Sequence, residues 1–425
     1  MPAAEVVEAV RAAAHPLTGQ PGDYAPLLEL VGDNRFVLLG EATHGTHEFY
    51  EERARITRQL IQEKGFSAIA IEGNWADADR VNRYIRGLGQ DPGATQALAN
   101  FKNEFPDWMW SNAAMRDLVT WLREHNARLP AERRVGFYGL DLYGVWPSAQ
   151  ATIELLQGLD QQAAQRARER YKCFEGFRKD AQAYGQVAAS RPNRSCQRVA
   201  LEQVRELEKI VEAEASRTDP ARRERLFAAL QNARVVKGGE EYFRILYAGG
   251  LSPWNVRDRH MADTLDDLSQ YLDAQGKPEK IVVWAHNTHL GDARVTQMAE
   301  SGELNVGQLM RQRHDGQAVL VGFTTYSGTV RAASQWGDRA QVKEVRPAMP
   351  GSYSHLFHQT GVGDFLLLLR GRPVAGTLPG PLLERAIGVV YLPQREREQH
   401  YFQARLPQQF DAVIHLDETR AVEPI

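Results

Sequence analysis

The sequence predicts an α/β fold with a largely parallel central sheet, flanking helices and an all-helical insertion that forms a lobe over a cleft. Short, almost continuously apolar runs alternate with amphipathic, helix-like stretches, which is typical of parallel strands buried on both faces. Between about residues 150 and 260 the strand pattern disappears and only helical periodicity remains. The composition, 43% hydrophobic and 25% charged, is that of a folded globular chain.

The strands are expected from apolar runs that end in polar or glycine-rich turns. In chain order these runs cover residues 35–40, 67–73, 134–140, 280–285, 318–323, 388–392 and 411–416. The carboxyl ends of parallel strands lie at one edge of a sheet, where α/β proteins bind their ligands. Polar side chains that directly follow these runs are therefore the first candidates for a functional site.

The helical insertion is predicted over residues 151–260, between two parts of the α/β core at 1–150 and 261–425. One of its apolar stripes recurs at i, i+4, i+7 and i+11 amid charged residues and consists of Ala200, Val204, Leu207 and Val211. Because such stripes need a surface to cover, we expect the insertion to pack over the cleft rather than to form a separate body.

Charge and cysteine content exclude several classes of protein. Acidic residues (54) exceed basic ones (51) by three, so no positive field favours a nucleic-acid partner. The N-terminus shows no signal-peptide pattern, and no apolar run approaches the ~20 residues that cross a bilayer, so no membrane partner is expected. Cys173 and Cys196 are the only cysteines and form no CxxC, so we expect neither a disulfide framework nor a thiolate zinc cluster. These features favour a cytoplasmic protein.

The turn after the first run, residues 40–48, reads GEATHGTHE and contains a carboxylate, Glu41, and two imidazoles, His44 and His47. In the helix that follows, Arg53 occupies the apolar stripe. A cation in that position either extends outward to water or forms a forked ion pair with a carboxylate at a strand end. The alternative without a functional role is that this turn is an ordinary solvated loop with a capping threonine.

Three later runs end in the same way. Glu72, followed by Trp75, ends the second run, and Asp141 ends the third. The sequence WAHNTHLGD at 284–292 places two histidines after the fourth run. If the strands are parallel, one edge of the sheet carries Glu41, His44, Glu72, Asp141, His286 and His289. We expect substrate contacts, direct or supporting, from Trp75, Asp141 and His260, the last in the charge-dense segment 257–261.

These residue types fit two chemistries, water activation by histidine or divalent-metal binding by the same side chains. The HxxH pairs lie in loops and HExxH is absent, so we favour the metal-free chemistry and keep a divalent metal as the alternative. The chain has no GxSxG elbow, no P-loop and no complete dinucleotide fingerprint, so no cofactor is expected. A binding protein that sequesters a small molecule or heme without turnover is the alternative from another class.

Several motifs together resemble the erythromycin esterase family, in its broad bacterial branch. They are GEATHG with EFY (40–50), IEGNW (71–75), DWMW (107–110), YGLD (138–141), WNVRD with HM (254–261), WAHNTHLGD (284–292), ELNVG (303–307) and FDAV (410–413). The resemblance implies hydrolysis of an ester by activated water, without a serine acyl-enzyme. In the best-known members, associated with antibiotic resistance, the ester is the macrolactone of a 14-membered macrolide. It also implies that His44 is the general base, with Glu41, Glu72, Arg53, His286 and His289 as the matching site residues.

The expected substrate is therefore a small-molecule ester. In the predicted mechanism His44 takes a proton from water while Glu41 or Glu72 fixes its tautomer. His286, with Arg53 or His289, polarises the ester carbonyl and later protonates the leaving alkoxide.

Overall fold

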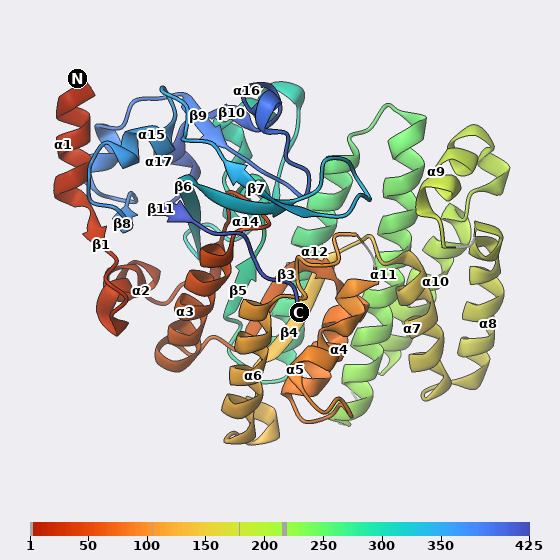
Figure 1. Ribbon diagram of the computed structural model, residues 1–425. Helices are drawn as coiled ribbons and strands as arrows, with labels where there is room; N and C mark the ends of the chain where they lie inside the picture. Colours follow the sequence, from red (N-terminus) through yellow and green to blue (C-terminus); the bar gives the residue numbers. More distant parts are fainter. Residues whose placement is uncertain (1–2, 104, 178, 215–218) are drawn as a thin grey trace. The chain divides into compact units, whose positions relative to one another are not determined.

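The computed structural model describes residues 3–103, 105–177, 179–214 and 219–425 (Figure 1). The chain forms two compact units. The first, the sheet unit, extends to Ala70 and continues through Val81–Gly136 and Pro278–Ile425. The second, the helical unit, consists of Ile71–Arg80 and Phe137–Lys277.

The main sheet has the strand order β1-β8-β11-β6-β2-β5-β3-β4, and β7 pairs with β6. Its strands are β1 (His15–Pro16), β2 (Phe36–Leu39), β3 (Ala68–Asn74), β4 (Gly136–Asp141), β5 (Ile281–Trp284), β6 (Ala318–Ala332), β7 (Gln341–Val345), β8 (Phe365–Leu368) and β11 (Ala412–Thr419). β2 pairs in parallel with β5 and β6, and β6 pairs in parallel with β11. The antiparallel pairs are β8 with β11, β1 with β8 and β7 with β6. The predicted α/β fold with a largely parallel sheet is confirmed.

Helices account for the continuous hydrophobicity of the central strands. Every residue of β2 and β5 is buried, as parallel strands covered on both faces require. The helices within the sheet unit are α1 (Ala3–Ala13), α2 (Ala25–Val31), α3 (His47–Lys64), α5 (Ala94–Ala97), α6 (Ala113–Ala127), α13 (Asn287–Leu290), α14 (Val306–Arg313), α15 (Tyr353–His358), α16 (Glu396–Gln399) and α17 (Leu406–Gln409). A small antiparallel sheet, β9 (Leu382–Arg385) with β10 (Tyr401–Ala404), accompanies them.

The predicted strand at 388–392 is wrong. In this region Ile387 and Val390 form only isolated bridges, with Thr43 and Ala333. Pro393 follows directly, and a proline offers no backbone N–H to a ladder. The other six predicted runs are strands, and the structure adds β8 next to β11, from a four-residue apolar run too short for periodicity to identify.

The helical unit contains the long helices that the segment 151–260 predicts. They are α7 (Val145–Gln157), α8 (Gln161–Tyr171), α9 (Ala181–Ser190), α10 (Gln197–Ala213), α11 (Pro220–Ala248) and α12 (Pro253–Ala274), with α4 (Trp75–Ile85) divided between the two units. Side chains that accept from the first-turn N–H groups cap α8, α9, α11 and α12, and they belong to Asp160, Asp180, Asp219 and Ser252. The apolar stripes of α7 to α11 share one core. The predicted domain limits and the position of a lobe over the cleft stay predictions.

Cys173 and Cys196 form a disulfide within the helical unit, with their Cα atoms 5.9 Å apart. A single bridge is not the disulfide framework that the sequence excludes, but it removes the support that two free thiols would give to a reducing compartment. The cytoplasmic location therefore stays a prediction. Among the described residues, no helix combines the length and the apolar character needed to cross a bilayer.

The disulfide can be tested by thiol labelling. Purified protein unfolded without reductant should take up no maleimide, and reduced protein should take up two, as counted by mass spectrometry. The cysteines are 23 positions apart, so reduction should lower the free energy of unfolding by about 3 kcal/mol. A Cys173→Ser variant is the control, because reductant should not change its stability. Labelling of both thiols without reductant would contradict the bridge.

Candidate active site

A hydrogen-bonded line of three side chains begins where β2 ends. The Nδ1–H of His44 donates to Oε1 of Glu41 at 2.7 Å, and the other carboxylate oxygen, Oε2, pairs with Nη2 of Arg53. Glu41 and Arg53 are fully buried, whereas His44 keeps 8% of its surface exposed. Because Nδ1 carries the proton, a neutral His44 has its lone pair on Nε2. The arrangement is suited to general base catalysis.

Arg53 is held from several sides inside the sheet unit. Its guanidinium carbon lies 4.8 Å from the ring centre of Tyr50 and 4.6 Å from that of Trp284. Its Nε donates to the carbonyl of Phe49 at 3.1 Å. Arg53 pairs with a carboxylate at a strand end as predicted, but through Nη2 alone and not as the predicted fork. The outward-extended alternative is wrong, because α3 directs this position into the core.

The turn after β5 carries the second histidine. Nδ1 of His286 accepts from the backbone N–H of Thr288 at 3.2 Å and lies 2.8 Å from its Oγ1. A neutral His286 therefore carries its proton on Nε2 and can donate it. The ring centres of His44 and His286 are 4.9 Å apart, so this structure brings the two imidazoles together. His289, also buried, lies in α13 of the same turn.

The helical unit contains a second cluster of charges. Arg257, on α12, donates from Nη2 to Glu72 Oε1 at 2.7 Å and reaches both oxygens of Asp141, at 2.5 and 3.0 Å. Burial alone lowers the pKa of Arg257, but the negative charges of Asp141 and Glu72 hold it well above its usual value. The guanidinium also lies 4.8 Å from the ring centre of Tyr143.

Arg257 is a site residue that the sequence prediction missed. Glu72 lies two residues before the end of β3 and Asp141 ends β4, and two buried carboxylates together require a cation. That requirement and the position of Arg257 in the WNVRD motif are the two features of the sequence that point to this residue. Helix periodicity does not show which carboxylates this arginine contacts.

Trp75 also lies in the helical unit, where it is buried against other aromatic rings. Its ring centre is 5.6 Å from that of Tyr138 and 5.7 Å from that of Phe227. Its predicted contact with substrate stays a prediction. So does the meeting of Glu72 and Asp141 with His44 and His286 at one edge of the sheet.

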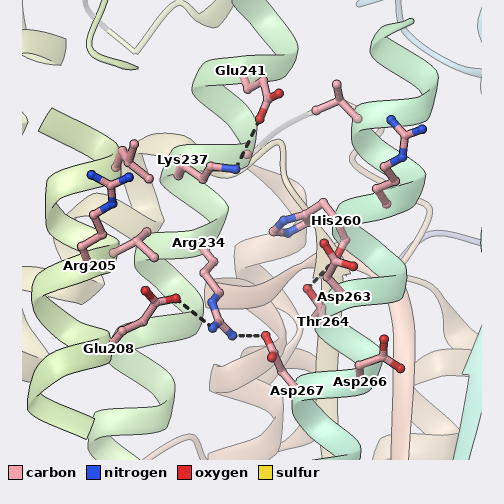
Figure 2. A pocket seen from close by; sticks show the side chains of 15 residues that line it. Arg205, Glu208, Arg234, Lys237, Glu241, His260, Asp263, Thr264, Asp266 and Asp267 are labelled. Atoms are coloured by element: carbon pink, nitrogen blue, oxygen red, sulfur yellow. Dashed lines mark hydrogen bonds and ion pairs between the residues drawn. The ribbon is translucent and has the colours of Figure 1, made fainter. Parts of the chain in front are cut away.

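His260 lines a cavity of about 640 Å³ among α10, α11 and α12 (Figure 2). It points from α12 toward α11, where a Cβ at Gly238 would come within 3.0 Å of its Nδ1. Burial lowers the pKa of His260 to about 4, so the ring is neutral at neutral pH. Arg234 pairs with Glu208 and Asp267 across this cavity. The predicted part of His260 in substrate binding stays a prediction.

The described residues contain no group of three His, Cys, Asp or Glu side chains arranged to hold a metal ion. The metal-free mechanism and its metal-dependent alternative, both predicted from the sequence, stay predictions.

Comparison with known families gives the class of this protein. The family model described as Erythromycin esterase matches residues 61–419. The chain belongs to the erythromycin esterase family.

Relatives are distant in sequence and similar in fold. The chain is 22% identical to erythromycin esterase type II from Escherichia coli, over 95% of this chain and 94% of that protein. A crystal structure described as a succinoglycan biosynthesis protein matches with a TM-score of 0.80 and 21% identity, over 99% of this chain and 98% of the other. An erythromycin esterase mutant solved in its open conformation matches with a TM-score of 0.65 and 19% identity, over 93% of each chain. At these identities the solved structures support the fold alone.

Replacing Arg53 tests the buried ion pair. Arg53→Met should lower the free energy of unfolding by about 3–5 kcal/mol, because it leaves the Glu41 carboxylate buried without a counter-ion. Arg55→Met is the matched control on the same helix. Its partner Glu52 is partly exposed, so the loss should stay below about 1 kcal/mol in urea titrations. Equal losses in the two variants would contradict the assignment.

Proposed function

We propose that this protein is a carboxylic ester hydrolase in which His44 activates water, without a serine acyl-enzyme. One observation carries the proposal: His44 Nδ1 is bonded to a fully buried carboxylate that is itself paired with a buried arginine. This leaves Nε2 of His44 as a proton acceptor. Membership of the erythromycin esterase family supports an esterase at the level of the family.

In the proposed reaction, water attacks the ester carbonyl carbon while His44 Nε2 takes one of its protons. The Glu41 carboxylate, whose Oε2 pairs with Arg53, accepts the hydrogen bond from Nδ1 of the imidazolium that forms and stabilises its charge. Arg53 is assigned to Glu41 rather than to the ester, because it lies between two aromatic rings and is fully buried. Glu41, rather than Glu72, is assigned as the carboxylate that orients His44.

His286 is proposed to act on the other side of the reaction. Its Nδ1 accepts from Thr288, so Nε2–H can donate to the carbonyl oxygen as negative charge develops there. When the tetrahedral intermediate collapses and the C–O bond breaks, the leaving alkoxide receives the proton held by the imidazolium of His44, so that both histidines end the reaction neutral. His289 lies in the same turn and is proposed to support this step.

The substrate class proposed is a small-molecule ester, and the macrolide lactone is one candidate within it. The relative from Escherichia coli carries the name erythromycin esterase type II, but an identity of 22% leaves the choice of ester to experiment. A panel of 14-membered macrolides and simple aryl esters, assayed with pure protein, tests the class.

The general base is tested by His44→Asn. On any ester that the parent hydrolyses, kcat should fall at least ~10²-fold, because the variant lacks the acceptor at Nε2. His47→Asn is the matched control, since His47 lies three residues on and its side-chain Nε2 pairs with the exposed Glu51, at 3.6 Å. It should keep kcat within about threefold. Near-normal kcat in His44→Asn, with both variants folded by circular dichroism, would remove His44 from the mechanism.

The metal alternative has its own test. We expect turnover to survive prolonged chelation, because Glu41 already serves as a hydrogen-bond partner of an imidazole and of a guanidinium. Loss of activity with a chelator, restored by zinc or manganese, would favour the metal-dependent hydrolase. A visible absorbance band in the purified protein, without ester turnover, would favour a heme-binding protein.

A further inference from the structure

A polar platform lies behind the turn that carries His286 and His289. Its centre is Asn287, whose Nδ2 donates to the carbonyl of Phe323 at 2.7 Å and whose Oδ1 accepts from the N–H of Phe323 at 3.2 Å. The backbone N–H of Asn287 donates to the carbonyl of Glu41 at 2.8 Å. The platform therefore joins the turn after β5 to the turn after β2.

Glu384, on β9, forms the base of this platform. Its Oε1 accepts from Nδ2 of Asn287 at 3.3 Å, and the amide side chain of Gln409 lies near enough to the carboxyl to lower its pKa. Gln409 in turn packs against Gly291 at the end of the same turn, where a Cβ would lie 2.7 Å from its Nε2. Glu384 thus supports the histidine turn at both of its ends.

The carboxyl of Glu384 has no cation beside it among the described residues. It is 2% exposed, and its Oε2 lacks a hydrogen-bond partner within the described ranges. The neighbouring cation, Arg385, points to the opposite face of β9 and pairs there with Glu396 at 3.3 Å. A carboxylate buried without a counter-ion is costly, so the neutral acid is the form that this site favours.

We propose that Glu384 is a positioning residue of the active site and that it holds the His286–His289 turn as a neutral carboxylic acid. Its ionisation would place an uncompensated negative charge behind that turn and disturb the alignment of His286. The inference rests on the proposed function for its kinetic consequence, but not for its structural one.

The surroundings agree with this assignment. Burial raises the pKa of Glu384 to about 8, and the amide side chains of Gln409 and Asn287 lower it only in part. Tyr353 is the titratable group that faces it from α15, and burial raises the pKa of that phenol to about 12. Arg405 lies beyond Tyr353 and donates to the carbonyl of Gly380. Ionisation of Glu384 therefore changes the charge behind the histidine turn at mildly alkaline pH.

The kinetic test is the pH profile of Glu384→Gln, which keeps the shape and stays neutral. Its kcat at pH 7 should lie within about twofold of the parent. At pH 9 roughly nine-tenths of the parent carries ionised Glu384, so its kcat should be lower than that of the variant by roughly tenfold. Glu384→Ala should lose activity at both pH values. Superimposable profiles of parent and Glu384→Gln would overturn the proposal.

A matched control tests whether the expected effect on the pH profile is specific to Glu384 or follows from replacing any buried glutamate. Glu396 is also a buried glutamate, but it is paired with Arg385 and accepts from the Tyr391 hydroxyl at 2.8 Å. Glu396→Gln should destabilise the fold, because it leaves Arg385 without its carboxylate, and should keep the alkaline loss of activity. A variant that removes this loss would show that Glu384 is not its source.

Two readouts need no substrate and so distinguish failure of this inference from failure of the esterase assignment. Unfolded Glu384 ionises near pH 4.5 and the folded group near 8, so the stability that it contributes at low pH is lost between these values. The unfolding equilibrium constant of the parent should therefore rise relative to that of Glu384→Gln by up to tenfold per pH unit. The His286 imidazole nitrogen signals should shift near pH 8 in the parent only. Absence of both effects would refute the proposal even if esters are hydrolysed.

Discussion

The buried ion pair between Arg53 and Glu41 is the interaction on which the arrangement of the site depends. Both side chains are fully excluded from solvent, so each charge is stable only because the other is present. The pair fixes one carboxylate oxygen and thereby leaves the second for His44. The aromatic rings of Tyr50 and Trp284 then hold the guanidinium in a single orientation. A change in any of these contacts would therefore alter the position of the His44 imidazole.

Two buried glutamates in the same unit illustrate how the surroundings set protonation. Glu41 has Arg53 as its partner, which favours the carboxylate. Glu384 has amide donors but no cation among the described residues, and burial raises its pKa to about 8. Asn287 touches both of them, through its backbone to Glu41 and through its side chain to Glu384. The same turn is thus connected to one carboxyl group that is paired with an arginine and to one that has no cation beside it among the described residues.

The sequence predicts the parts of the site that depend on local order along the chain. Glu41 and His44 could be found because they directly follow an apolar run, and Arg53 because helix periodicity places it among apolar residues. Arg257 and Glu384 could not be found in this way, since their importance arises from residues far away in the sequence. The strand predicted at 388–392 failed for a related reason: of these residues only Tyr391 is buried, and the segment contributes one isolated bridge, between Val390 and Ala333, rather than a ladder.

A buried ion pair is a weak source of stability, because desolvation of the two charges offsets most of their attraction. Its retention in the core of the sheet unit is better explained by what it orients. Replacing both partners by apolar side chains could preserve the fold, yet His44 would lose the acceptor that fixes its Nδ1 proton. His286 obtains the opposite tautomer from a backbone N–H, without any charge. The difference matches the proposed chemistry, because the imidazole that becomes charged needs a nearby carboxylate and the one that only donates does not.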